Sequence, residues 1–278
     1  MFKLAQIKEN DPFQHHLSFH VLDRQILPQA SGVELGESDV DLWKVSLDMP
    51  RNQIDELYYT LSGVEQRKAD YFRFAEQRSS YIISYGILRK VLGAYLKMNP
   101  VELNFNYGKN GKPVLAGVPS DEMIHFNMSS SRNLTVIAIS RYYEIGIDIE
   151  YIGDIPEIDR TANQFFSKAE ADVFHALPVY EKTKAFYNCW TRKQAFLKAI
   201  GNGSLYPLKT FDVTLAPHEP AQLLRVKGKP QEASRWSIQA IMPETNYTGA
   251  IAVRNFNFQL KIYEDWYREH SEAYQLAA

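Results

Sequence analysis

The sequence predicts an α+β protein with two related halves. The order of strands and helices before residue 141 is broadly repeated after it. Each half has one long helix, and Arg89 and Arg192 open similar stretches of these helices, 103 residues apart. No low-complexity linker separates the halves. We therefore expect them to meet near residue 141 and to pack tightly, as internal repeats within one compact unit do.

Composition excludes several classes of protein. Apolar residues make up 45% of the 278 residues and charged residues 23%, as in an ordinary globular protein with its own core. The 31 basic and 33 acidic side chains give a net charge of −2, which argues against a nucleic-acid-binding surface. The single cysteine, Cys189, excludes an intramolecular disulfide and is predicted to be a buried thiol. Without a signal sequence or a long apolar run, the chain is predicted to be cytoplasmic and not membrane-bound.

The first half is predicted to follow a solvated leader over residues 1–35, whose His15, His16 and His20 are expected to be exposed rather than to bind a metal. Apolar residues at helical spacing over 76–96 predict a long helix facing a core. Asn110-Gly111 favours a two-residue hairpin turn. The other expected elements are a strand over 41–47, helices over 53–61 and 65–72 with Ser62 as N-cap, and strands over 124–127 and 134–140.

The second half is predicted to begin with a strand over 144–150, in which alternate residues share a face. Ser167 with Glu170 indicates a capping box at the start of a helix. The remaining expected elements are a long helix over 181–200, strands over 210–215, 236–240 and 249–253, and a docked helix over 259–275.

Two groups of residues could carry chemistry. Asp148 and Glu150 share one face of a strand, and paired carboxylates suit Mg²⁺, which binds through one or two carboxylates plus substrate phosphates. Trp190, Gln194 and Lys198 follow each other at intervals of four, so they share a helix face. The alternatives are an exposed strand edge with two acids, and a helix whose polar residues flank the core.

A third group consists of Lys112 beside the hairpin turn and Ser129 at the end of a strand, which could both hold phosphate oxygens. The motifs of several other enzyme classes are absent. The sequence contains no nucleophile elbow, phosphate-binding P-loop, dinucleotide-binding glycine motif or zinc-protease helix.

Taken together, these motifs resemble those of the Sfp-type 4′-phosphopantetheinyl transferases, and most closely the cyanobacterial branch associated with heterocyst glycolipid synthesis. The resemblance covers about residues 41–253 and implies a pseudo-twofold monomer with its active site between two similar subdomains. The implied parts are a leader (1–35), a first subdomain (36–141), a second subdomain (142–255) and a helical tail (256–278). The motifs are Gly111-Lys112-Pro113, Phe126-Asn127-x-Ser129, Ile145 to Glu150, and Trp190 to Lys198.

The resemblance implies Mg²⁺-dependent transfer of phosphopantetheine from coenzyme A to a serine of an acyl or peptidyl carrier protein, in secondary metabolism, with release of adenosine 3′,5′-bisphosphate. Asp148, Glu150 and Gln194 match the metal-ligand positions. Lys198, Gln194 and Asp148 match the catalytic positions. The positions implied to contact coenzyme A are Lys68, Lys112, Ser129, Ser130 and Lys198.

Three positions depart from the family pattern. Gln194 replaces a glutamate that is both a metal ligand and the presumed base, and losing a general base costs roughly 10²–10⁴ in rate. Ser130 replaces a histidine and Ser80 an arginine, both of which serve the 3′-phosphate in the family. Arg78 or Arg132 could compensate for them.

The departures leave two alternatives open beside the active enzyme. The chain could be a non-catalytic relative that binds a carrier protein or a nucleotide. It could instead use a diphosphate that lacks the 3′-phosphate, such as dephospho-coenzyme A.

Overall fold

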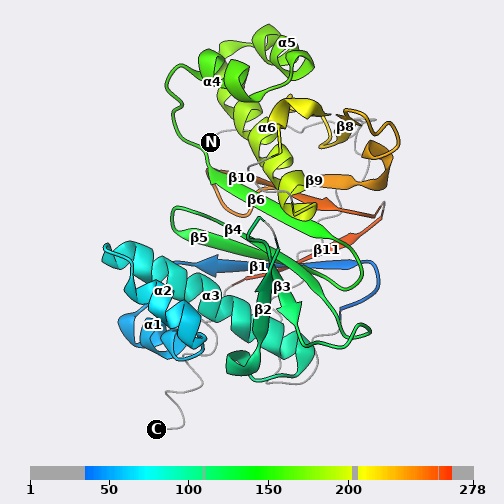
Figure 1. Cartoon of the computed structure of the whole chain (residues 1–278). Helices are drawn as coiled ribbons and strands as arrows, with labels where there is room; N and C mark the ends of the chain where they lie inside the picture. The colour runs from blue at the N-terminus through cyan, green and yellow to red at the C-terminus, as the bar shows by residue number, and fades with distance from the viewer. Residues whose placement is uncertain (1–34, 109, 202–205, 256, 265–278) are drawn as a thin grey trace, which may run out of the picture.

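The computed structural model describes residues 35–108, 110–201, 206–255 and 257–264, and is drawn in Figure 1. The leader's three histidines lie outside the described residues. Within the described part of the chain, none of the helices combines the length and apolar character needed to cross a membrane.

The first half contains most of the predicted elements. Its long helix α3 buries the predicted stripe, with Leu88 and Leu92 fully enclosed. Its elements in chain order are β1 (Asp39–Ser46), α1 (Arg51–Tyr58), α2 (Gly63–Asp70), α3 (Ala75–Leu96), η1 (Pro100–Glu102), β2 (Asn104–Tyr107), β3 (Pro113–Ala116), β4 (His125–Ser131) and β5 (Leu134–Ser140).

The second half repeats this order with small differences. Helix α4 and strand β8 were not predicted, because both are short. Its elements are β6 (Ile145–Tyr151), α4 (Ile158–Phe165), α5 (Lys168–Ala176), α6 (Val179–Ala199), η3 (Leu208–Thr210), β7 (Phe211–Val213), β8 (Leu223–Val226), η4 (Ala233–Arg235), β9 (Ser237–Ile241), β10 (Tyr247–Val253) and β11 (Gln259–Tyr263).

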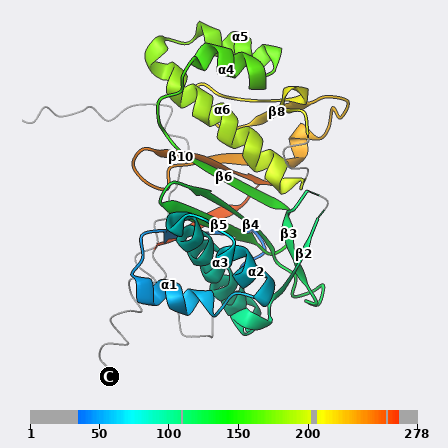
Figure 2. The ribbon, with the colours of Figure 1, turned by 60° about the vertical axis from the view of Figure 1, so that its left-hand side comes forward.

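The elements form four layers, seen from two sides in Figures 1 and 2. The sheet β11-β1-β5-β4 lies between α3 and the sheet β6-β10-β9, and α6 covers the far side of the second sheet. Three apolar clusters fill the spaces between the layers. The middle cluster contains Ile145, Ile147 and Ile149, so the other face of β6 is turned towards α6, as its period of two predicts.

A repeated contact fixes the long helix of each half. In the first half, Ser62 and Glu65 form a capping box at the start of α2. The same Glu65 carboxylate accepts a hydrogen bond from buried Arg89 of α3, at 2.6 Å. Arg89 also donates to the carbonyls of Pro100 and Leu103, at 2.8 and 2.9 Å, so it ties α2, α3 and the approach to β2 together.

The second half has the corresponding contact. Ser167 and Glu170 form the predicted capping box at the start of α5. Buried Lys193 of α6 lies 2.8 Å from the Glu170 carboxylate and donates to the carbonyls of Leu208 and Phe211. Arg89 therefore corresponds to Lys193 rather than to Arg192, one residue away from the alignment that the sequence suggested.

Hydroxyl contacts between helix and sheet follow the same repeat. Ser84 of α3 bonds Thr135 of β5 at 2.8 Å, and Thr248 of β10 donates to Asn188 of α6 at 3.4 Å. Thr135 is paired with Val45 of β1, and Thr248 with Glu150 of β6. The two halves thus share one plan of contacts.

The hairpin turn is longer than predicted. Tyr107 pairs with Pro113, and the Gly108 N–H donates to the Lys112 carbonyl at 3.0 Å. Gly111 is left-handed, with φ of 80°, but the last paired residues of the two strands are Tyr107 and Pro113, so the predicted two-residue turn is wrong. Instead, the amide of Asn110 donates to the Gly201 carbonyl beyond α6, at 2.9 Å, which joins the hairpin to the second half.

The predicted helix over 259–275 is wrong in its first five residues. Gln259–Tyr263 forms β11, parallel to β1, Glu264 is not helical, and residues 265–275 lie outside the described residues. Leu260 and Ile262 alternate onto the middle apolar cluster, whereas Tyr263 stacks on Trp43 with ring centroids 4.3 Å apart. The exposed edge of β1 provided hydrogen-bond partners that the helical spacing of aromatic residues did not reveal.

Candidate active site

Asp148, Lys198 and Ser129 meet where β6, α6 and β4 come together. The Lys198 ammonium lies 2.7 Å from Asp148 Oδ1 and 2.9 Å from the Ser129 hydroxyl. The Ser129 hydroxyl donates to the same Asp148 oxygen at 3.1 Å. The lysine side chain keeps 29% of its surface exposed, whereas Asp148 is buried. A charged lysine thus stands at the edge of the group, where it can meet a ligand.

The second oxygen of Asp148 is unsatisfied. Oδ2 is buried and has no hydrogen-bond partner among the described residues. Burial raises the pKa of Asp148, and the ion pair with Lys198 opposes this shift. An uncompensated buried carboxylate oxygen is costly, so its presence beside a second acid indicates a place for a cation or another donor.

Glu150 is the second acid on this face of β6. Its Oε2 accepts a hydrogen bond from Ser131 of β4 at 3.0 Å, and the side chain of Trp190 of α6 also hydrogen-bonds it. Partial burial raises the pKa of Glu150, and the negative charge of Asp148 adds to the shift. The two carboxylates therefore disfavour each other's charge, which a bound cation would relieve.

Gln194 lies between these two contacts on α6. Lys198 is one turn beyond it and reaches Asp148, and Trp190 is one turn before it and reaches Glu150. The half-buried Gln194 therefore belongs to the helix face that runs along both acids. Its amide offers a neutral oxygen ligand and no site for a proton.

The donor set fits Mg²⁺ in part. Mg²⁺ takes oxygen ligands and keeps waters and substrate phosphates among them. The unpartnered Asp148 oxygen, Glu150 and the Gln194 amide match that chemistry. Among the described residues there is no cluster of three or more His, Cys, Asp or Glu side chains suited to a metal. Such a site would therefore carry two protein charges.

Alternate side chains of β4 run along the backbone of β6, and sequence reasoning missed this role. Asn127 accepts a hydrogen bond from the Ile147 N–H at 2.9 Å, Ser129 from Ile149 at 3.3 Å, and Ser131 from Tyr151 at 3.0 Å. Polar residues at every second position of β4 are the signal that could have revealed it. Strand β4 thus extends beyond the strand predicted over 124–127 and includes Ser129, Ser130 and Ser131.

The side chain of Lys112 reaches from the hairpin to the C-terminal end of α6, away from this group. Its ammonium donates to the carbonyls of Ile145 and Ala199, each at 3.0 Å. Burial lowers its pKa to about 8. In this arrangement Lys112 holds the hairpin against the start of β6 and the end of α6.

Lys68, Ser80 and Ser130 lie on the side of the first half. Exposed Lys68 stands over the Tyr81 ring of α3, 5.1 Å from its centroid. The Ser130 hydroxyl bonds Thr135 at 2.6 Å, and Thr135 also bonds Ser84. Ser80 is one turn before Ser84 on α3, so the two departures from the family pattern face the same region.

Both arginines that could compensate for Ser80 and Ser130 have other partners. Arg78 pairs with Asp70 at 3.1 Å. The Arg132 guanidinium lies over the Tyr151 ring of β6, 3.6 Å from its centroid. The structure thus offers no arginine beside Ser130 among these two.

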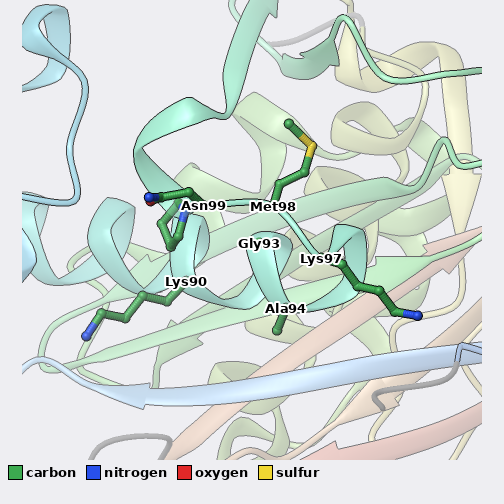
Figure 3. Close-up of a pocket in the computed structure, with 7 residues that line it drawn as sticks. Lys90, Gly93, Ala94, Lys97, Met98 and Asn99 are labelled. Atoms are coloured by element: carbon green, nitrogen blue, oxygen red, sulfur yellow. The ribbon is translucent and has the colours of Figure 1, made fainter. Parts of the chain in front are cut away.

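A separate pocket of about 520 Å³ lies at the C-terminal end of α3 (Figure 3). By the repeat, its Lys90 and Ala94 occupy the positions of Gln194 and Lys198. Its seven lining residues include none of the predicted site residues.

Comparison with known proteins places this geometry in a family. Residues 49–141 match the model of the 4′-phosphopantetheinyl transferase N-terminal region, and residues 144–252 match that of the 4′-phosphopantetheinyl transferase superfamily. The chain is 35% identical to the 4′-phosphopantetheinyl transferase HetI of Nostoc sp. over 243 residues, covering 87% of this chain and 99% of HetI.

A second relative is the 4′-phosphopantetheinyl transferase Sfp of Bacillus subtilis, which is 30% identical over 185 residues, covering 66% of this chain and 79% of Sfp. The chain therefore belongs to the 4′-phosphopantetheinyl transferase superfamily and, within it, to the Sfp-type transferases of the cyanobacterial HetI branch.

Proposed function

We propose that this transferase moves the 4′-phosphopantetheine arm of coenzyme A onto a serine of an acyl or peptidyl carrier protein, with Mg²⁺ held by Asp148, Glu150 and Gln194. The observation that carries the proposal is the unpartnered buried Oδ2 of Asp148, whose other oxygen pairs with Lys198 and which shares a strand face with Glu150. The oxygens of a diphosphate need positive charge beside them. Lys198 and a cation held by the two acids would supply it.

The reaction exchanges one phosphorus–oxygen bond for another. The carrier serine oxygen attacks the phosphorus that bears the pantetheine arm, while the bond from that phosphorus to the bridging oxygen breaks. Adenosine 3′,5′-bisphosphate leaves with the bridging oxygen. When bound, Mg²⁺ would neutralise charge on the diphosphate. Lys198 donates hydrogen bonds to the leaving phosphate. Its partial exposure allows it to turn from Asp148 to this new partner.

The proton of the carrier serine goes to water in this proposal. The amide of Gln194 is neutral and accepts no proton at ordinary pH. Asp148 and Glu150 are engaged with Lys198, Ser129 and Ser131 and would hold the cation. The cytoplasmic location, the monomeric state and the subdomain boundaries remain predictions from the sequence.

The test is incubation with coenzyme A, MgCl₂ and a panel of acyl and peptidyl carrier proteins, read by intact mass. We expect one carrier to gain one phosphopantetheine, and Asp148→Asn to abolish the gain. The exposed, remote Ser234→Ala serves as the matched control. The proposal is wrong if no carrier gains mass while a known phosphopantetheinyl transferase loads the same panel.

A second candidate is transfer from a diphosphate that lacks the 3′-phosphate. It is favoured by neutral Ser80 and Ser130 and by the engagement of Arg78 and Arg132 elsewhere. Charged hydrogen bonds contribute roughly 1.5–3 kcal/mol each, so losing two weakens recognition of the phosphate. Equal or higher kcat/KM for dephospho-coenzyme A would support this candidate, and strict dependence on the 3′-phosphate would exclude it.

A third outcome is a carrier complex without any mass gain. It would point to a binding protein. The observation that favours this outcome is the neutral side chain of Gln194, which cannot accept the serine proton. Native mass spectrometry of the same mixtures separates this outcome from transfer.

A further inference from the structure

Ser129 and Ser131 make the same pair of contacts two residues apart. Ser129 accepts from the Ile149 N–H and donates to Asp148 Oδ1. Ser131 accepts from the Tyr151 N–H and donates to Glu150 Oε2. Each hydroxyl thus binds the carboxylate of one β6 residue and the backbone N–H of the next.

This double contact fixes the direction of each hydroxyl proton. A serine hydroxyl has one donor and two acceptor lone pairs. The Tyr151 N–H approaches the Ser131 oxygen at 3.0 Å, so the Ser131 proton is left for Glu150. The backbone of β6 therefore aligns the serine, and the serine aligns the carboxylate.

Trp190 holds Glu150 from the other side. The Trp190 side chain acts on Glu150 as a hydrogen-bond donor that lowers the pKa of the carboxyl, and an indole N–H can only donate. The ring is itself supported by Phe186, parallel to it at 6.5 Å, and by Phe165, edge-on at 5.3 Å. A glutamate has three rotatable side-chain bonds, and donors from β4 and α6 restrict them.

We propose that Ser131 is a positioning residue that holds Glu150 in the orientation of a cation ligand, with Trp190 as its partner on α6. The proposal rests on the proposed function, because it assigns the cation to the same two acids. Hydrogen-bond partners behind metal ligands typically raise metal affinity or activity by about 10–100-fold.

The test measures Mn²⁺ binding directly by electron paramagnetic resonance, with and without coenzyme A, so that it does not depend on turnover. We expect Ser131→Ala to weaken Mn²⁺ binding by about 10–100-fold. Ser131→Thr keeps the hydroxyl and should restore most of the affinity. Trp190→Phe keeps the aromatic stack, loses the donor and should weaken binding in the same direction. Ser234→Ala should leave Mn²⁺ affinity unchanged.

Two further measurements separate positioning from folding. The melting temperature of Ser131→Thr should match that of the parent protein. In a Glu150→Gln background, Ser131→Ala should cause little additional loss of Mn²⁺ affinity, since coupled residues are not additive.

Wild-type Mn²⁺ affinity in Ser131→Ala would overturn the proposal. So would a failure of the parent protein to bind Mn²⁺ in either condition. If Mn²⁺ binds and Ser131→Ala weakens it, but no carrier is loaded, the positioning role stands and the proposed transfer fails.

Discussion

Gln194 is the residue whose chemistry most limits this site. It lies on the α6 face that runs along Asp148 and Glu150, where it contributes no charge and accepts no proton. The carboxylate pair therefore lacks a third acid that could both bind a cation and take the serine proton. The rate of transfer and the strength of cation binding should both respond to this one position.

Gln194→Glu should raise kcat of carrier loading by roughly 10²–10⁴, because it restores a general base. Cation affinity should rise as well, since a third negative charge joins the site. The measurements are loading kinetics by intact mass and Mn²⁺ titration. The control is Gln194→Asn, which shortens the amide and adds no charge. An unchanged rate with tighter Mn²⁺ binding would show that the base lies elsewhere.

Asp41 is a buried acid of β1 that is remote in sequence from the site. Its carboxylate accepts a 2.5 Å hydrogen bond from Tyr95 of α3, and Oδ1 is buried without a partner among the described residues. Burial raises the pKa of Asp41 to about 6, against 3.8 ordinarily. Between these values the folded protein holds a proton that the unfolded chain has lost, so stability falls as pH rises from about 4 to 6.

Asp41→Asn should remove this slope. The shift corresponds to about 3 kcal/mol, and the amide oxygen can still accept from Tyr95. Urea unfolding at pH 4 and pH 7 should show the parent losing stability by this amount relative to the variant. Asp172→Asn, on the exposed surface of α5, is the control. Parallel pH profiles for parent and Asp41→Asn would contradict the assignment.

At the scale of elements, α6 and β6 approach each other unusually closely. A Cβ on Gly146 would lie 2.1 Å from the Ala195 carbonyl oxygen and 2.3 Å from the Ala199 nitrogen. Both atoms are backbone, so a side chain there cannot be accommodated by a rotamer change. Glycine at this point lets the helix lie against the strand and brings Lys198 to Asp148.

Gly146→Ala should therefore lower stability by about 1–3 kcal/mol or more and push α6 away from β6. The Lys198–Asp148 contact should lengthen, and carrier loading should fall further than stability alone explains. Urea unfolding and loading rates at a temperature where the variant stays folded check this. Gly63→Ala at the exposed start of α2 is the control. Full activity in a folded Gly146→Ala protein would contradict it.

Sequence reasoning predicted the elements of the site better than their contacts. The period of two over 144–150 was enough to place Asp148 and Glu150 on one face, and the spacing of Lys198 and Trp190 placed them on one side of α6. The contacts of Ser129 and Lys112 join segments far apart in the chain, so local pattern gave no access to them. The helix predicted for the tail was wrong for a related reason, because β11 forms by pairing with the edge of β1.

At the scale of the molecule, the two halves use one buried ion pair each to lock the long helix. Glu65 with Arg89 and Glu170 with Lys193 lie 2.6 and 2.8 Å apart, and all four side chains are nearly inaccessible to solvent. Breaking such a pair leaves an uncompensated buried charge. This correspondence also confirms the prediction of two related α+β halves.

Lys193→Met and Arg89→Met should each lower the free energy of unfolding by about 3–5 kcal/mol. Adding Glu170→Gln or Glu65→Gln to the matching variant should recover part of that loss. Crossed combinations, such as Lys193→Met with Glu65→Gln, should recover nothing. Denaturant unfolding of the six proteins checks this, and recovery in the crossed pairs would contradict the independence of the two locks.

The C-terminal strand β11 makes the two halves differ, because it pairs with β1 of the first half. By the repeat, Trp43 and Val45 of β1 occupy the positions that Asp148 and Glu150 occupy on β6, and Tyr263 of β11 lies against Trp43. The first half thus has an aromatic pair where the second half has its acids. A chain with twofold architecture should accordingly bind its nucleotide with a stoichiometry of one.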